Sequence, residues 1–255
     1  MLMKISAKDI ASLVRTLSKT ANKPHFTSAI IVAAGKGTRM QDESGKTKQH
    51  LEICGIPVIV RTLTAFEKCD MIDEIIIVAR KEEMSEYDRY KREYGLTKIT
   101  AVVNGGDTRQ ESVLRGFEAI NDKSEFVAIH DGARCLIRGV DIEAVLRAAY
   151  QYGAATAASR ATDTVKRADR NSFITETIER ENLWLASTPQ IFKTEVYRAA
   201  AYVAKEDGFT TTDDNALAER VGFSVKLVDV GSENIKITTK SDIPVAEAII
   251  NRRAK

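Results

Sequence analysis

The chain has 255 residues, 44% of them apolar and 29% charged, with a formal net charge of +2, so it is long enough for a large α/β core and too evenly charged for a general nucleic-acid binder. Three cysteines without a CxxC pair and three histidines without metal-ligand spacing indicate neither a disulfide framework nor a zinc site. No apolar run is long enough to span a membrane, and we expect a reduced, cytoplasmic protein that binds no membrane.

Residues 1–27 form a separate segment in which apolar residues recur at helical spacing between Lys, Arg and Ser. We expect an amphipathic extension that packs on the main domain or frays from it. Asp9 is the one acidic residue before Asp42, so an organellar targeting segment is the alternative.

From residue 28 the chain alternates between apolar runs and helical patterns. The predicted strands are 30–32, 74–78, 99–103 and 126–129, and the predicted helices are 57–69, 81–94, 107–120 and 142–152. Near-continuous apolar strands that alternate with helices predict a mostly parallel sheet with helices on both faces. Ligands of such sheets bind at the carboxyl ends of the strands.

After residue 154 the pattern changes. A strand is expected at 154–159, followed by a β-hairpin arm at about 162–187 with its turn at 169–172. Such an arm is marginal alone, so it should contact the body or a second subunit. We then expect helices near 193–205 and 213–221, strands at 225–230 and 235–238, and a last helix that begins at Ser241.

The sequence IIVAAGKGTRM, from Ile30 to Met40, is a buried strand followed by a glycine loop. Gly35 and Gly37 allow a tight turn close to a ligand, and Arg39 supplies a cation suited to phosphate oxygens. The loop fits neither a P-loop nor the dinucleotide fingerprint, in which Met40 would replace a small residue. A nucleoside triphosphate is the expected ligand, and a turn without a ligand is the alternative.

Further polar residues follow the other strands. Lys48 follows the glycine loop and is a second candidate cation for a triphosphate. Asp107 begins a helix, and we expect it to cap that helix. Asp131 ends a strand and is a candidate Mg²⁺ ligand, because Mg²⁺ is usually held by one or two carboxylates plus substrate phosphates. Lys236 is either a surface lysine or a further ligand of an anion.

The segments AAGKGTRM, TKQ, GGDTRQES, HDGAR, DTVKR, ERENLWLASTPQ, TTDD and NIKIT resemble, in order and spacing, the 2-C-methyl-D-erythritol 4-phosphate cytidylyltransferase (IspD) family. The resemblance covers residues 28–250. It implies a Rossmann-like nucleotidyltransferase fold whose protruding β-arm forms a homodimer, and cytidylyl transfer from CTP to methylerythritol phosphate with Mg²⁺ in the non-mevalonate isoprenoid pathway.

The resemblance also implies roles for individual residues. The residues expected to bind CTP are Ala33, Ala34, Gly35, Gly37, Arg39, Lys48, Gly106, Asp107, Ser112, Asp131 and Gly132. Those expected to bind methylerythritol phosphate are Asp131, Arg134, Thr164, Arg180, Thr188 and Lys236, with Thr164 and Arg180 supplied by the arm of the partner. The residues expected to act in catalysis are Arg39, Lys48, Arg180 and Lys236, and Asp131 is the expected metal ligand.

Two differences from the family pattern lie in the HDGARC segment, where we expect HDAARP. Gly132 is small enough to be tolerated, whereas Cys135 in place of proline should loosen the loop after Arg134. Other functions stay open, among them sugar-1-phosphate nucleotidyltransferases, whose usual Lys-Pro segment is replaced here by TKQ. Ribitol-5-phosphate cytidylyltransferases share the glycine loop but differ in the arm motifs, and a catalytically silent nucleotide-binding dimer scaffold should have lost the charged residues, which are present here.

Overall fold

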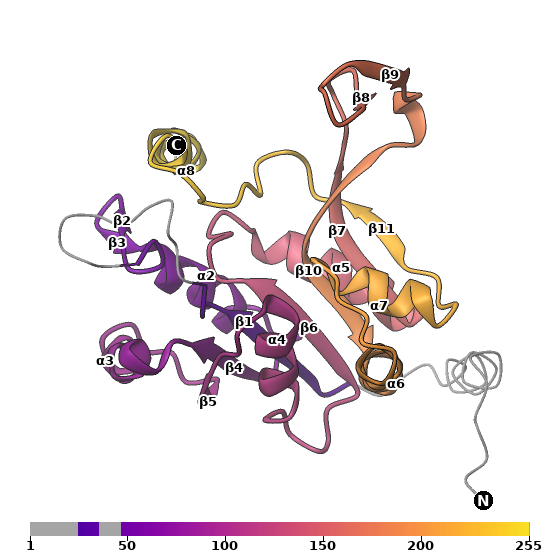
Figure 1. The fold of residues 1–255 in the computed structure, drawn as a ribbon. Helices are drawn as coiled ribbons and strands as arrows, with labels where there is room; N and C mark the ends of the chain where they lie inside the picture. Colours follow the sequence, from indigo (N-terminus) through magenta and orange to yellow (C-terminus); the bar gives the residue numbers. More distant parts are fainter. Residues whose placement is uncertain (1–24, 36–46, 255) are drawn as a thin grey trace, which may run out of the picture.

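The computed structural model describes residues 25–35 and 47–254 of the 255. Its centre is a seven-stranded sheet with the order β11-β7-β10-β6-β1-β4-β5 (Figure 1). The strands are β1 (Thr27–Val32), β4 (Glu74–Ala79), β5 (Ile99–Asn104), β6 (Phe126–Asp131), β7 (Ala154–Arg160), β10 (Trp184–Lys193) and β11 (Lys226–Asp229). All neighbouring pairs are parallel except those of β10, which is antiparallel to both β6 and β7.

Helices cover both faces of this sheet. They are α2 (Val58–Glu67), α3 (Met84–Glu93), α4 (Arg109–Phe117), α5 (Gly139–Tyr152), α6 (Thr194–Glu206) and α7 (Asn215–Arg220), whereas α8 (Asp242–Arg253) packs beside the short strand β2 (Glu52–Ile53). Successive strand residues point to opposite faces, so Ile31 packs with α2, α3 and α5, whereas Ile30 packs with α4, α6 and α7. Burial on both faces explains why the strands are continuous apolar runs, and the predicted α/β sheet is confirmed.

A two-stranded arm stands away from this body (Figure 1). Its strands are β8 (Lys166–Ala168) and β9 (Ile174–Thr177), which pair antiparallel around a turn at residues 169–173. The arm carries exposed apolar side chains, among them Phe173, which is 71% exposed, and Ile174, which is 66% exposed. The predicted hairpin is therefore confirmed, with little of its apolar surface buried within the chain.

Smaller elements complete the described chain. The hairpin β2 (Glu52–Ile53) and β3 (Ile56–Pro57) precedes α2, and two 3₁₀ turns are η2 (Lys81–Glu83) and η3 (Arg180–Asn182). Among the helices of residues 25–35 and 47–254, none has the length and apolar character needed to cross a bilayer. The predicted N-terminal extension lies, apart from its last three residues, outside the described residues.

One strand prediction was wrong, and one strand of the central sheet was not predicted. Residues 235–238 form no strand, because Ile237 is buried against Ile53 and Leu136 while its N–H bonds to the carbonyl of Ala133 outside any ladder. Strand β10 was not predicted, because residues up to 187 were assigned to the arm; Pro189 within it is unusual for a central strand. The pairing of β10 with β7 shifts register between Ala186 and Gln190, and this irregularity accommodates the proline.

Candidate active site

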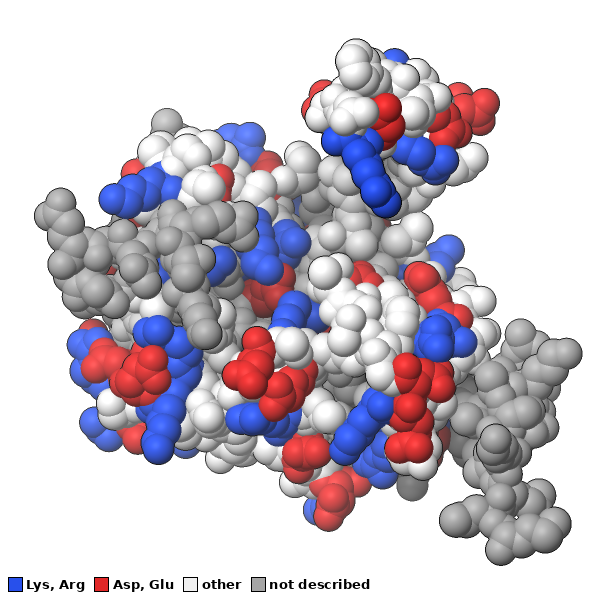
Figure 2. Space-filling model, in the orientation of Figure 1, with Lys and Arg blue, Asp and Glu red and all other residues white. Residues whose placement is uncertain are grey.

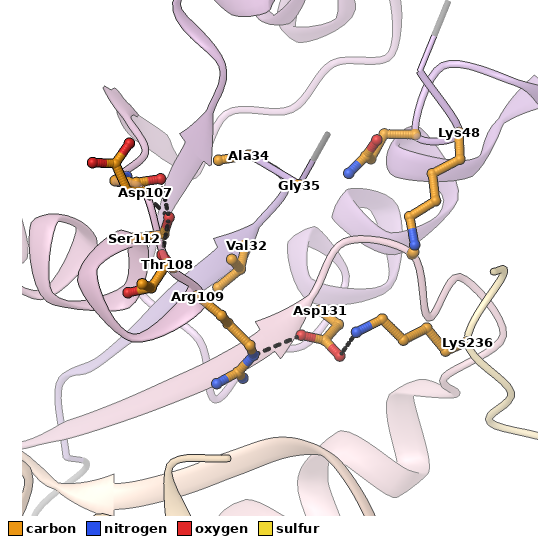
Figure 3. Close-up of a pocket in the computed structure, with 13 residues that line it drawn as sticks. Val32, Ala34, Gly35, Lys48, Asp107, Thr108, Arg109, Ser112, Asp131 and Lys236 are labelled. Carbon is orange, nitrogen blue, oxygen red and sulfur yellow. Dashed lines mark hydrogen bonds and ion pairs between the residues drawn. The ribbon is translucent and has the colours of Figure 1, made fainter. Parts of the chain in front are cut away.

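A pocket lies where β1 and β6 end side by side. β1 pairs with β4 on one side and β6 on the other, so the chain order reverses at this point, where open α/β sheets bind ligands. The cavity volume is about 290 Å³. Figure 3 shows its lining, which includes the predicted residues Ala34, Gly35, Lys48, Gly106, Asp107, Ser112, Asp131 and Lys236.

Asp131, at the end of β6, is surrounded by cations. Lys236 Nζ lies 2.8 Å from Asp131 Oδ2, and Arg109 Nε lies 3.2 Å from Asp131 Oδ1, so the two cations approach opposite oxygens (Figure 3). Arg134 Nε is 3.7 Å from Oδ2. Burial would raise the pKa of Asp131, but the charges of Lys236 and Arg109 outweigh it and hold that pKa well below its usual range. The carboxylate is therefore ionised.

The segment that carries Lys48 is bonded to three separate parts of the body. Lys48 Nζ donates to the carbonyl of Ile237 at 3.1 Å, and Gln49 Nε2 donates to the carbonyl of Ala33 at 2.9 Å. The hydroxyl of Thr47 donates to Glu83 Oε1 at 2.6 Å. These bonds direct the ammonium group of Lys48 toward the same side of the pocket as Asp131 (Figure 3).

The GGD segment leads into α4 on the other side of the pocket. The helix is capped by Thr108, whose hydroxyl accepts from the N–H of Glu111, and the expected cap by Asp107 was wrong. The carboxylate of Glu111 instead accepts from the N–H of Asp107. This bond and the Thr108 cap together close the first turn of α4. Ser112 Oγ accepts from the N–H of Gly106 at 3.0 Å and thereby fixes the loop at the helix N-terminus.

His130 is buried behind the pocket and links β6 to β10. The hydroxyl of Thr188 accepts from the N–H of Asp131 and lies 3.0 Å from His130 Nδ1, while His130 Nε2 lies 3.2 Å from the carbonyl of Arg134. Because a carbonyl only accepts, Nε2 carries the proton and Nδ1 accepts from Thr188. Burial lowers the pKa of His130 to about 3, so the ring is neutral and supports the loop.

The other predicted residues that the structure describes do not line the pocket. Ala33 and Gly132 are buried behind it, and Thr188 and Arg134 flank Asp131 through the bonds just described. Thr164 and Arg180 are exposed on the arm, where the Arg180 guanidinium bonds to the carbonyl of Thr162. Neither lines the pocket of its own chain. Gly37 and Arg39 lie outside the described residues.

The neighbouring side chain of Ile59 explains why position 132 holds a glycine. A Cβ at Gly132 would lie 2.7 Å from Cδ1 of the fully buried Ile59 and 3.2 Å from the carbonyl oxygen of Val32. Isoleucine at position 59 therefore fills the space that an alanine side chain would need. Cys135 is buried with Leu136 and Ile237, and burial raises the pKa of its thiol to about 11.

Several residues of the site were missed as site residues from the sequence. Arg109 joins Asp131 to Asp214 of the TTDD segment, 105 positions away. Gly105 packs so closely that a Cβ there would lie 2.2 Å from that of Ala34. The glycines of the GGD motif allow this close approach and could have predicted it from the sequence. Which residues Arg109 contacts depends on the fold alone.

The sequence model of the 2-C-methyl-D-erythritol 4-phosphate cytidylyltransferase (IspD) family matches residues 27–252. The chain belongs to this family. It is similar to the family member of Geobacillus kaustophilus, with 41% identity over 225 residues that cover 88% of this chain and 97% of the relative. The member from Caldanaerobacter subterraneus is 42% identical over 227 residues, which cover 88% and 99% of the two chains.

Solved structures of family members agree with the fold. The crystal structure of 4-diphosphocytidyl-2C-methyl-D-erythritol synthase from Anaerococcus prevotii superimposes with a TM-score of 0.81 at 32% identity, covering 90% of this chain and 97% of the other. The cytidylyltransferase of Francisella tularensis gives a TM-score of 0.73 at 27% identity, covering 88% and 99%. The Rossmann-like family fold is therefore confirmed.

Proposed function

We propose that this chain transfers the cytidylyl group of CTP to 2-C-methyl-D-erythritol 4-phosphate, giving 4-CDP-2-C-methyl-D-erythritol and pyrophosphate. One observation supports this most directly. This chain belongs to the family and has a pocket at the ends of β1 and β6 in which Arg109 and Lys236 contact Asp131 and which Lys48 also lines. A polyanionic nucleotide and a phosphate acceptor need such a cation-rich site.

The chemistry requires positioning and neutralisation of charge. An oxygen of the acceptor phosphate attacks the α-phosphorus of CTP, and the bond from that phosphorus to the bridging oxygen breaks, so pyrophosphate leaves with the electron pair. Because a phosphate monoester is largely ionised near neutral pH, no general base is needed. The cations must bring two anions together and stabilise charge on the reacting phosphorus.

The roles of the residues follow this division. Lys48, with the glycine loop, would hold the triphosphate, and Gly106, Asp107 and Ser112 would meet the cytidine end. Lys236 and Arg134 would hold the acceptor phosphate. The face shown in Figure 2 has acidic and basic side chains intermixed.

A divalent cation fits the pocket only together with substrate. Within residues 25–35 and 47–254 no group of three or more His, Cys, Asp or Glu residues is placed to hold a metal. Asp131 alone would offer one carboxylate, and Mg²⁺ often takes one carboxylate plus phosphate oxygens and water. Bound there, it would neutralise phosphate charge. Since both oxygens of Asp131 already contact cations, Lys236 would have to turn from Asp131 toward the substrate phosphate.

The arm supports the proposal of a homodimer. Thr164 and Arg180 are exposed and do not line the pocket of their own chain, while Phe173 and Ile174 present unburied apolar surface. A second copy would bury that surface and bring its Arg180 to the acceptor site. When Lys48→Ala and Arg180→Ala proteins are mixed in equal amounts and exchange subunits, about half of the dimers are mixed, and each mixed dimer has one intact site out of two. Activity should then return at about a quarter of all sites. Absence of any restoration would count against the shared site.

The test of the function itself is pyrophosphate release from CTP and Mg²⁺, with methylerythritol 4-phosphate and ribitol 5-phosphate in parallel. Release with the first acceptor alone is the expected result. Release with ribitol 5-phosphate alone would replace the proposed acceptor, and binding of CTP without release would indicate a silent scaffold. The cytoplasmic location stays a prediction.

A further inference from the structure

The guanidinium group of Arg109 connects a pocket carboxylate to a buried one behind it. Arg109 Nη1 donates to Asp214 Oδ2 at 2.7 Å, and Arg109 Nε donates to Asp131 Oδ1 at 3.2 Å. Asp214 does not line the pocket, and its side chain is 1% exposed. Since Nε and Nη1 point in different directions, one rigid planar group fixes the relative position of the two carboxylates.

Asp214 is itself fixed to the sheet. Its N–H donates to Gln190 Oε1 at 2.8 Å, and Gln190 Nε2 donates to Asp213 Oδ2 at 2.8 Å. Gln190 belongs to β10 and stands beside Ile129 of β6, two residues before Asp131. The hydroxyl of Tyr197 lies 3.3 Å from Asp214 Oδ1 and gives that oxygen a partner. Asp214 is therefore tied to β10, and Asp131 belongs to the adjacent strand β6.

The start of α4 is bonded to the same segment. Gln110 Oε1 accepts from the N–H of Thr211, and Gln110 Nε2 donates to the carbonyl of Phe209. Residues 209–214 thus hold both Arg109 and the helix turn that follows the GGD loop. None of these six residues lines the pocket.

Stability alone does not account for this arrangement. A cation in the first turn of a helix opposes the helix dipole, and buried ion pairs can often be replaced by apolar groups without loss of stability. The charges of Asp214 and Asp131 raise the pKa of Arg109 against the effect of its burial, so the guanidinium stays charged. The arrangement does supply a fixed orientation for Asp131 between Arg109 and Lys236.

We propose that Arg109, anchored by Asp214, is a positioning residue that holds the Asp131 carboxylate in the orientation needed for cytidylyl transfer. The inference rests on the proposed function, and it makes the TTDD segment part of the working site although the segment does not line the pocket. Loss of an outer partner of this kind lowers activity by about 10–100-fold in other sites.

The experiment compares Arg109→Lys, Asp214→Asn and the double variant with wild type, and Tyr197→Phe is the control. Lysine keeps the charge beside Asp214 but presents one nitrogen in place of two separate donors. We expect Arg109→Lys to lower kcat about 10–100-fold with little change in Tm or in the KM for CTP. Asp214→Asn should lower kcat similarly, and the double variant should be no worse than the poorer single one, because the two residues act as a unit.

Tyr197→Phe removes a partner of Asp214 without touching the Arg109 bridge. It should lower Tm but keep kcat within about threefold of wild type. A kcat of Arg109→Lys equal to that of wild type would overturn the inference. So would losses that multiply in the double variant, or kcat losses that follow Tm across all four variants. Wild-type protein without turnover would refute the proposed function instead, which is measured first and separately.

Discussion

The fit of Gly132 against Ile59 gives a quantitative prediction for Gly132→Ala. The new Cβ would lie 2.7 Å from Ile59 Cδ1 and 3.4 Å from the Cβ of Ala33, inside a fully buried cluster. Overpacking of a well-packed core costs about 1–3 kcal/mol, and the lower entropy of the unfolded chain returns about 0.4–1 kcal/mol. We therefore expect a net loss of about 1–2 kcal/mol in the free energy of unfolding.

A second substitution tests whether this contact is the cause. Ile59→Val removes Cδ1 and alone should cost about 0.5–1.5 kcal/mol. In the double variant the alanine methyl occupies the vacated space, so the two losses should fall short of additivity by about 1 kcal/mol. Gly139→Ala is the matched control, because a Cβ at the first residue of α5 meets nothing within 4 Å. It should leave stability unchanged or raise it.

Urea denaturation of the four variants and wild type measures these differences through the transition midpoints. The reasoning would be refuted if Gly132→Ala were as stable as wild type. It would also be refuted if the losses from Gly132→Ala and Ile59→Val added without coupling. Either result would mean that the loop around Asp131 shifts easily, so that the identity of residue 59 does not explain the glycine.

Three further predictions concern charge and reactivity. Burial opposes ionisation of Glu83, but bonds from Arg80 and Thr47 and the nearby His50 lower its pKa from 4.5 to about 2. Its ionised form thus contributes about 3 kcal/mol of stability above pH 4.5 that is lost as pH falls toward 2, and the stability gap between wild type and Glu83→Gln should narrow over that range in urea titrations. A constant gap would contradict this. Lys48→Ala should lower kcat by roughly 10²–10³-fold with the fold intact, and a loss under about threefold would remove Lys48 from the mechanism. Native protein treated with iodoacetamide at pH 8 should be alkylated at the exposed Cys54 and not at Cys135, whose buried thiol has a pKa of about 11. If mass spectrometry found Cys135 alkylated at the same rate as Cys54, the burial of Cys135 would be refuted.

Much of this architecture follows from local pattern. Residues 30–32 and 75–78 are runs of branched apolar residues, and such runs form strands wherever both faces of a sheet are covered. A second rule, that such sheets bind ligands at the carboxyl ends of their strands, located the site where Gly35 and Asp131 lie. The hairpin at 162–187 was predictable because its turn residues and alternating strands are local features.

Long-range contacts were not predictable in this way. Lys48 donates to the carbonyl of Ile237 across 189 positions, and Arg109 bridges Asp131 to Asp214 because α4 and the segment before α7 meet at one edge of the sheet. Neither partner is marked by periodicity or spacing. The sequence by itself determined most strands of the central sheet, the arm, the family and the edge at which the site lies. The tertiary structure decided which charges meet there and why Gly132 has no room for a side chain, since both depend on packing between elements far apart in the chain.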